Sequence, residues 1–531
     1  MGGTSGRTAT KRGWPSLVAT SGPASRRGLQ PATAASGTTD DYYLLSVYTQ
    51  KIADSVGAPP ALLGSLKEHI MVKHGRRLRM LAATVPVAVL FAAACGGSPA
   101  ATAGPAAASG TTQPSSASPP PSATGVCGSG VTCFTPQQLQ AAYAVKPLLD
   151  RGIDGRGETV VLPELAESQP NPPLITDLRQ DMTAYDGMFN LPAARMRVVS
   201  TLARSGSPWL AFGEEVLDVE VVHALAPDAN LVILLLPSTS LDNTANAVAA
   251  ALGEFRLGPG LGGVMSISAA GQIGGEHCLS HAQADSLNTA LQAAVSRGMT
   301  VVTASGDIGA ATYQCDLYAA LTGTPPVNPG RGVLMLASDP FALSVGGTAL
   351  TADGGGAWSS ETAWGLASGN PGNAGGSFQG SGGGFSELFA RPSYQAGVAG
   401  IGATRGVPDV SADASDRTGV AVVFSNGGQR TVQSHGGTSS AAPIWAAMIA
   451  LADQYAGRHL GFVDPGLYQI ARGPSYHRAF HDITTGNNTA QFPPTTVTGY
   501  RAAPGWDPVT GWGSPDAQVL IPLLARTNVP G

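Results

Sequence analysis

Residues 436–443 read Gly-Gly-Thr-Ser-Ser-Ala-Ala-Pro and lead directly into an apolar run that ends at Leu451. The pattern predicts a loop that becomes a helix, with Ser439 at the junction. Small residues let a substrate carbonyl approach the backbone, and the unpaired first amides of a helix favour negative charge. Pro443 fits an early helical position that does not need its N–H. An ordinary helix N-cap would have the same sequence, so the other motifs of the chain are needed to distinguish a nucleophile from a cap.

Apolar, strand-like runs alternate with helical segments over the last four hundred residues. Continuous apolar strands between helices indicate an α/β fold with a mostly parallel central sheet and helices on both faces, and sites in such folds gather at the carboxyl ends of the strands. The expected strands are Thr159–Leu162, Asn230–Leu236, Val264–Ser268, Thr300–Ala304, Ala342–Val345 and Val420–Phe424, and the expected helices are Glu214–Leu225, Asp285–Arg297 and Ser440–Tyr455. Gly354 to Gly384 is expected to be a surface loop.

Two acids stand four residues apart on one of these predicted helices. Glu214 and Asp218 therefore share a helix face. Two buried acids held close together retain one proton between them, and such a pair can accept a proton from a serine at acidic pH. The alternative is a solvated helix face.

A third acid, Asp307, follows a buried strand in the sequence Val-Val-Thr-Ala-Ser-Gly-Asp. If it is protonated there, it can donate a hydrogen bond to a substrate oxyanion. A turn-capping aspartate is the alternative. The histidines offer weaker candidates for a base: we expect His435 to be a solvated loop residue and His223 to be a packed helix residue.

Taken together, these segments resemble the sedolisins, or serine-carboxyl peptidases, which have a subtilisin-like fold. The resemblance covers roughly the last four hundred residues, with the motifs in order. They are Phe134–Tyr143, Leu217–Pro227, Ser305–Asp307, Gly346–Thr348, Arg405–Asp413, Gly437–Ser439 and Gly513–Pro515.

The resemblance implies a role for each acid and for the serine. Ser439 is the acylated nucleophile, Glu214 the general base and acid, Asp218 its supporting carboxylate and Asp307 the oxyanion donor. Glu164 matches a second glutamate that many members connect to the first. The resemblance also implies one Ca²⁺ ion near the C-terminus, held by hard oxygen ligands. Its ligands are two carboxylates and three carbonyls, from Asp482, Ile483, Ala503, Gly505 and Asp507; two loop aspartates that cap turns are the alternative.

Charge and composition narrow the function further. Residues 1–95 carry 11 basic and 4 acidic side chains, whereas residues 96–531 carry 19 and 31. The sequence contains no basic patch, so it gives no reason to expect nucleic-acid binding. Residues 96–531 are rich in carboxylates and contain a single lysine, Lys146. Repulsion between these carboxylates falls as pH falls, so this part of the chain is compatible with acidic surroundings.

The N-terminal part contains an export signal. Four basic residues from Lys73 to Arg79 precede an apolar run that ends at Cys95, and the run is too short to span a bilayer comfortably. Small residues before Cys95 resemble a lipoprotein processing site, which would make Cys95 the lipidated N-terminus; a plain secretory signal is the alternative. We therefore expect residues 1–70 to be a mis-called upstream extension or disordered, 71–95 a signal peptide, 96–126 a flexible Ala/Ser/Pro/Gly tether, and 127–531 the peptidase domain.

Four further cysteines follow the signal, and an even count after export favours disulfides. Of the three pairings possible, we favour Cys127–Cys133, which flanks a short loop, and Cys278–Cys315, which brackets one helix-strand unit.

The sequence thus predicts an exported, lipid-anchored, calcium-stabilised, monomeric serine endopeptidase that cleaves protein or peptide substrates at acidic pH and lies outside the cell or at its surface. It leaves three alternatives open. A tripeptidyl peptidase would use the same site. A non-catalytic binding protein on this scaffold is favoured by the lack of an expected prosegment and by Ala269-Ala270-Gly271, where the family often has a tryptophan. The third is a histidine-dependent hydrolase.

Overall fold

The computed structural model describes Cys127 and most of residues 133–527, which belong to one compact unit. The predicted extension, signal, Cys95 and tether lie outside the described residues, as does Ala269-Ala270-Gly271. Between 133 and 527, the residues not described are 168–175, 201–209, 212, 239–244, 247, 250–251, 253–262, 269–273, 312–314, 316–329, 366–379, 427–428 and 493–494.

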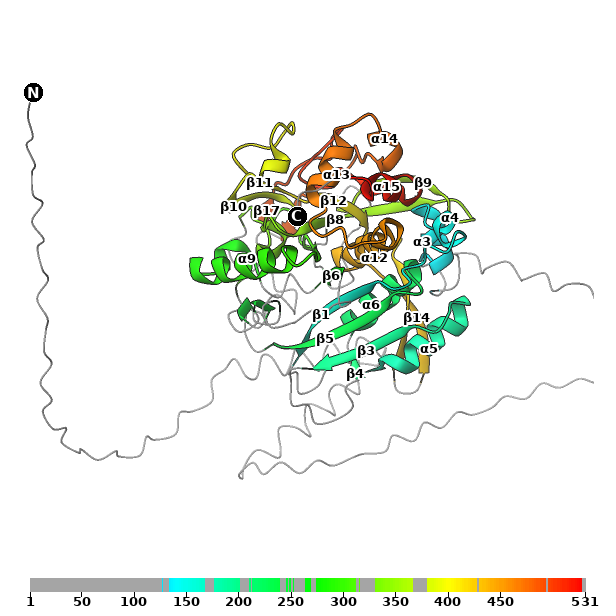
Figure 1. The fold of residues 1–531 in the computed structure, drawn as a ribbon. Helices are drawn as coiled ribbons and strands as arrows, with labels where there is room; N and C mark the ends of the chain where they lie inside the picture. Colours follow the sequence, from blue (N-terminus) through cyan, green and yellow to red (C-terminus); the bar gives the residue numbers. More distant parts are fainter. Residues whose placement is uncertain are drawn as a thin grey trace, which may run out of the picture. The chain divides into compact units, whose positions relative to one another are not determined.

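A central sheet of eight strands organises the molecule (Figure 1). Its order is β12-β8-β7-β6-β1-β5-β3, all neighbours in this path are parallel, and β9 pairs antiparallel with β8. The mostly parallel α/β sheet expected from the sequence is therefore confirmed. The strands are β1 (Thr159–Glu167), β3 (Arg195–Ser200), β5 (Asn230–Ser238), β6 (Val264–Ile267), β7 (Thr300–Ala304), β8 (Leu343–Ala352), β9 (Trp358–Ala363) and β12 (Val410–Asp413).

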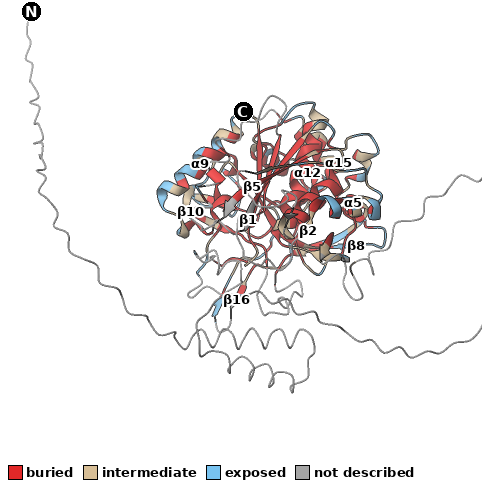
Figure 2. Cartoon of the chain, turned by 90° about the horizontal axis from the view of Figure 1, so that it is seen from below, coloured by how far each residue is buried: buried red, intermediate tan, exposed pale blue. Residues whose placement is uncertain are grey.

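Helices cover both faces of the sheet, because alternate residues of its strands belong to two separate hydrophobic cores. Val160 and Leu162 pack in the core that contains α6 and α12, whereas Val161 packs in the core that contains α9. Residues 159–164 of β1, 231–236 of β5 and most of α12 are accordingly buried (Figure 2). The helices are α3 (Pro136–Ala142), α4 (Lys146–Leu149), α5 (Leu178–Phe189), α6 (Gly213–Leu225), α9 (His281–Val295), α11 (Met335–Ser338), α12 (Thr438–Ala456), α13 (Asp464–Ala471), α14 (Tyr476–Ala479) and α15 (Ala517–Leu524).

One predicted sheet strand is misplaced. Val420–Phe424 forms part of β13, which pairs antiparallel with β14 in a separate hairpin instead of joining the central sheet. An apolar run identifies a strand but not its partner, so the sequence could not decide this. The other two-stranded pairs join β2 to β4, β10 to β11, β15 to β18 and β16 to β17. The strands outside the central sheet are β2 (Thr176–Asp177), β4 (Leu210–Ala211), β10 (Gly384–Ala390), β11 (Thr404–Val407), β13 (Val420–Asn426), β14 (Gln429–His435), β15 (Phe480–His481), β16 (Ala490–Phe492), β17 (Thr495–Val497) and β18 (Ser514–Pro515).

Residues 354–365 and 380–384, the described part of the glycine-rich stretch from Gly354 to Gly384, do not form the surface loop expected. Within it, Trp358–Ala363 forms β9 at the sheet, and Gly380 donates its N–H to the carbonyl of Asp307 at 2.8 Å. Gly382 lies so close to Ser305 that a Cβ there would approach the Ser305 carbonyl oxygen to 2.1 Å. The glycines of this segment thus allow two backbones to meet next to Asp307.

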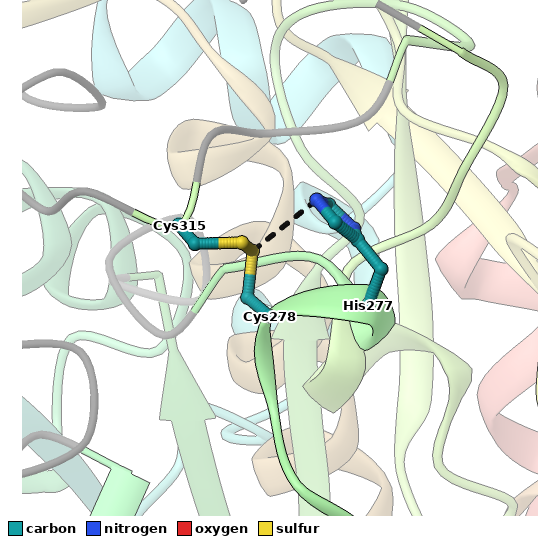
Figure 3. Close-up of side chains that lie close together, drawn as sticks. All are labelled: His277, Cys278 and Cys315. Carbon is teal, nitrogen blue, oxygen red and sulfur yellow. Dashed lines mark hydrogen bonds between the residues drawn. A yellow bond between two sulfur atoms is a disulfide. The ribbon is translucent and has the colours of Figure 1, made fainter.

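Both disulfides favoured from the sequence are present, Cys127–Cys133 and Cys278–Cys315. Figure 3 shows His277 beside the second one, with its Nε2 3.4 Å from Cys278 Sγ. These three side chains have the spacing of metal ligands, but the two sulfurs are bonded to each other and so are not available to an ion. In the part of the chain that the structure describes, no helix has the length and apolarity needed to cross a bilayer.

Candidate active site

The predicted acids and serine come from four neighbouring elements. Glu164 lies on β1, Asp307 follows β7, Glu214 and Asp218 lie on α6, and Ser439 lies on α12. Strands β1 and β7 flank β6 in the sheet, and α12 packs against both α6 and the sheet strands. Because parallel strands end at the same edge, this topology brings the side chains together at the carboxyl edge of the sheet.

Ser439 is the second residue of α12 and is half-buried. The helix begins after Gly437, whose φ of 87° favours glycine. A Cβ at Gly437 would also lie 3.1 Å from Asp307 Oδ2, so this residue keeps the approach to Asp307 open. Pro443 is not at the early position expected: it lies inside the helix, where a residue would donate its N–H to the carbonyl of Ser439. That carbonyl consequently lacks its helical donor.

Glu214 shares a hydrogen bond with the Ser439 side chain. Burial raises the pKa of Glu214 to about 7, the bond to Ser439 opposes this rise, and the nearby Asp307 carboxylate adds to it. A carboxyl with this pKa is ionised in part of the population at mildly acidic pH, and it is already in contact with the hydroxyl from which it would take a proton.

Asp218 lies behind Glu214 and is completely buried. Burial and the Glu214 charge raise the pKa of Asp218 well above its usual range, whereas hydrogen bonds with Ser268 and Glu164 lower it. Burial and the neighbouring acids, first among them Asp218, raise the pKa of Glu164 as well. Two acids in hydrogen-bond contact must hold a proton between them, so the Glu164–Asp218 pair stores a proton in the protein interior.

Asp307 is held by the residue that precedes the serine. The backbone N–H and the hydroxyl of Thr438 both donate to Asp307 Oδ1, at 2.7 and 2.8 Å. Burial nevertheless raises the pKa of Asp307 above its usual range. Since Oδ1 already accepts two hydrogen bonds, the proton of a neutral Asp307 belongs on Oδ2, the oxygen nearest Gly437.

The two histidines considered from the sequence are engaged elsewhere. His223 is fully buried, and its Nε2 lies 2.9 Å from the Pro192 carbonyl oxygen and 3.0 Å from Asp186 Oδ1. It is therefore a packed helix residue, as expected. His435 is not a solvated loop residue: it ends β14, is half-buried, and its ring lies 4.9 Å from that of Phe424. Burial lowers the pKa of His435.

The predicted calcium ligands lie in two adjacent loops. Gly505 donates its N–H to both oxygens of Asp482, at 3.1 and 3.2 Å, and Ala503 donates to Asp507 Oδ2 at 3.1 Å. Tyr476 contacts Asp482 and lies near Asp507. Burial, together with the charges of these two acids, raises the pKa of Tyr476. Burial also raises the pKa of Asp507 to about 6. Asp507 Oδ1 also accepts the N–H groups of Val509 and Thr510, and its Oδ2 accepts the Thr510 hydroxyl, so Asp507 caps a turn, as the alternative expects. The two carboxylates are nevertheless hard oxygen ligands of the kind that Ca²⁺ prefers, so the side chains present fit the ion.

Two residues of this site were not singled out in the sequence. Ser268 donates to Asp218 Oδ1 at 2.8 Å, and Thr438 orients Asp307. The sequence positions of both residues suggested a role in the site. Ser268 ends a predicted strand at the edge where sites form, and Thr438 precedes the predicted nucleophile. Serine and threonine are so common at such positions that this signal could not separate them from ordinary capping residues.

Comparisons with known proteins point in one direction. Kumamolisin from Bacillus sp. (strain MN-32) is 34% identical over 413 residues, which are 75% of this chain and 65% of kumamolisin. Sedolisin from Pseudomonas sp. (strain 101) is 35% identical over 237 residues, 44% of this chain and 36% of sedolisin. Tripeptidyl-peptidase 1 from Homo sapiens is 30% identical over 275 residues, 47% of this chain and 41% of that protein. The chain thus spans less than two thirds of the length of each of these relatives. No family model matches the chain.

The fold comparison agrees with these relatives. The solved structure of Pseudomonas sedolisin, described as a serine-carboxyl proteinase complexed with two molecules of pseudo-iodotyrostatin, matches with a TM-score of 0.58 and 24% identity. The match covers 74% of this chain and 98% of the sedolisin chain. The subtilisin-like architecture expected from the sequence is thereby confirmed, and over three quarters of its length the chain is similar in sequence to kumamolisin, a member of the sedolisin family.

Proposed function

We propose that this protein is a serine endopeptidase that hydrolyses peptide bonds of protein or peptide substrates at acidic pH through an acyl-enzyme on Ser439. One observation carries the proposal: the hydroxyl of Ser439 is hydrogen-bonded to Glu214, a carboxyl whose pKa burial raises to about 7. A serine needs a base within hydrogen-bond reach, and here an acid takes the place that histidine often fills.

The chemistry follows from this contact. Ser439 Oγ attacks the substrate carbonyl carbon and gives its proton to Glu214, while the carbonyl oxygen becomes an oxyanion. Neutral Asp307 donates a hydrogen bond from Oδ2 to that oxyanion. Glu214 then passes its proton to the departing amine, which leaves an ester on Ser439. Water enters, gives a proton to Glu214 and attacks the ester carbonyl, and the return of that proton to Ser439 releases the acid product.

Asp218 and Glu164 influence the protonation state of Glu214. Each proton that Glu214 accepts lies next to a pair that already holds one, so the acids of the site are mutually coupled and titrate together. Activity therefore rises with falling pH as Asp307 becomes neutral, and it is lost when Glu214 stays protonated.

The test is covalent labelling by a peptide aldehyde at acidic pH. Ser439→Ala is expected to abolish labelling and hydrolysis while its circular dichroism spectrum stays unchanged. His223→Ala serves as the opposite arm, because a histidine-dependent hydrolase would lose labelling in that variant and keep it in Glu214→Ala. Persistent labelling of Ser439→Ala contradicts the proposal, and a complete absence of hydrolysis in the unmodified protein supports a binding protein on this scaffold. Mass spectrometry of the products separates internal cleavage from release of tripeptides.

We further propose that one Ca²⁺ ion binds between Asp482 and Asp507, with the carbonyl oxygens of Ile483, Ala503 and Gly505 as the remaining protein ligands. The ion would neutralise the two acids and tie together the loops that carry them. A chelator is expected to lower the melting temperature of the protein, and added Ca²⁺ to restore it. In Asp482→Asn, the melting temperature should no longer respond to either reagent; an unchanged response excludes this site.

Export, lipid attachment at Cys95 and a monomeric state rest on sequence alone and are part of the same proposal. The mature protein is expected to begin at a lipid-modified Cys95, to lie at the cell surface and to sediment as one chain after detergent extraction. Mass spectrometry of the N-terminal peptide tests this directly. A peptide from residues 1–70 in the mature protein contradicts it.

A further inference from the structure

The hydroxyl of Ser268 lies between the acid pair and the main chain of the nucleophile. Ser268 comes directly after β6 and is only 5% exposed. The register that pairs Val160 with Val264 places Ser268 level with Glu164, at the carboxyl edge of the sheet. Its Oγ is 2.8 Å from Asp218 Oδ1 and 3.2 Å from the carbonyl oxygen of Ser439.

Pro443 explains why a side chain is needed at the Ser439 carbonyl. In an uninterrupted helix the N–H of residue 443 would donate to the oxygen of residue 439, but proline has no N–H. The carbonyl beside the nucleophilic side chain is thus left for an outside donor, and Ser268 is placed to be that donor.

A serine hydroxyl has one proton, so it cannot serve both acceptors at once. When Asp218 is ionised, Ser268 donates to Asp218 and the Ser439 carbonyl loses its donor. When Asp218 carries a proton on Oδ1, Asp218 donates to Ser268, which then donates to the Ser439 carbonyl. The direction of these two hydrogen bonds therefore follows the charge of Asp218, which faces the carboxyls of Glu214, Glu164 and Glu215.

We propose that Ser268 is a positioning residue that couples the protonation state of Asp218 to the main-chain position of the nucleophile, Ser439. This inference rests on the proposed function, because it assigns a role within the same site. Ser268 touches neither substrate nor the transferred proton; it acts through Asp218 and through the first turn of α12.

The sequence supplies a matched control. Ser266 lies two residues earlier on the same strand face and is fully buried, but its hydroxyl has no hydrogen-bond partner among the described residues. Ser266→Ala and Ser268→Ala therefore remove the same atom from neighbouring buried positions, and only the second removes the proposed coupling.

The experiment is a pH profile of kcat for these variants. In Ser268→Ala we expect kcat to fall about tenfold and the acidic limb to move about one pH unit upward, since the ionised acids lose a donor. Ser266→Ala should overlay the unmodified protein, and Ser268→Thr, which keeps the hydroxyl, should restore both values. Overlay of the Ser268→Ala and Ser266→Ala profiles overturns the proposal.

Pro443→Ala tests the second half of the coupling. It returns a helical N–H to the Ser439 carbonyl, so in the double variant with Ser268→Ala we expect kcat to recover while the shifted acidic limb remains. No recovery of kcat contradicts the link to the main chain. Infrared titration of the carboxyl groups gives a readout without turnover: if Ser439→Ala keeps full activity, the proposed function fails, but the carboxyl titration midpoints of Ser268→Ala and Ser266→Ala still decide whether Ser268 acts on Asp218.

Discussion

Glu361 and Glu164 are both buried glutamates with no cation beside them in the described part of the chain, yet their surroundings differ. Each oxygen of Glu361 accepts two hydrogen bonds, from Tyr143 and Thr348 on one side and from Trp358 and Ser514 on the other. Glu164 leaves Oε1 without a hydrogen-bond partner among the described residues and shares a proton with Asp218. The donors that surround Glu361 oppose the rise in its pKa that burial causes, whereas the neighbouring acids raise the pKa of Glu164 further.

The same substitution at both positions should separate the two roles, and Glu361→Gln should have the largest effect. An amide cannot accept from four donors, so its NH₂ group would face two N–H or O–H groups. Each unsatisfied buried group costs roughly 1–3 kcal/mol, and we expect the free energy of unfolding to fall by about 3 kcal/mol. Urea denaturation measures this change. A loss below about 1 kcal/mol would show that the four bonds do not stabilise Glu361.

The pH dependence of stability should reveal the acids whose pKa burial raises. Burial raises the pKa of Glu214 to about 7 and that of Asp453 to about 8, and it raises those of Glu164 and Asp218 as well. The folded protein holds these protons to higher pH than the unfolded chain does, so stability is greatest near pH 4 to 5 and falls as pH rises toward 8.

Denaturation by urea at each pH value measures this slope. Asp453→Asn provides the control, because it removes one acid from outside the site and should flatten the curve over the whole range between the unfolded and the folded pKa of Asp453, up to about pH 8. A stability that rises from pH 5 to 8 would contradict the assignment of protonated acids to the folded interior.

Glu164→Gln should have the smallest effect on stability. The amide resembles the protonated carboxyl in shape and charge, so the free energy of unfolding should change by less than about 1 kcal/mol. The pH profile of hydrolysis should still change, because the variant cannot exchange a proton with Asp218. If the loss of stability equals that of Glu361→Gln, Glu164 is a structural residue and the contrast between the two glutamates is wrong.

The sequence predicted the sheet better than it predicted the surroundings of the site. Apolar runs such as Thr300–Ala304 coincide with a strand because both faces of a covered parallel strand are buried. Val420–Phe424 has the same apolar pattern but belongs to a hairpin. The local sequence does not specify which strand an apolar strand pairs with. The strands Arg195–Ser200 and Val410–Asp413 were missed because charged or small residues interrupt their apolar pattern.

At the site, the residues with distinctive chemistry were predictable and their supports were not. Glu214, Asp218 and Asp307 could be singled out because the resemblance to the sedolisins gives them roles; their spacing alone is equally compatible with a solvated helix face or a turn cap. The second hydrogen bond of Ser268 depends on Pro443, which lies more than 170 residues away in sequence. A contact of this kind appears only when the fold brings α12 against β6.

Helix α12 has 19 residues and is buried along most of its length, with Ser439 near one end and Asp453 near the other. At the far end, Asp453 Oδ1 accepts the N–H of Leu460 at 2.8 Å, which fastens the helix about 20 Å from the nucleophile. Because α12 is one continuous helix, a change in packing near Asp453 that shifts the helix along its axis also moves Ser439. Random mutagenesis of this protein will therefore yield inactive but well-folded clones whose changes lie deep in the interior, far from any surface that a substrate could reach.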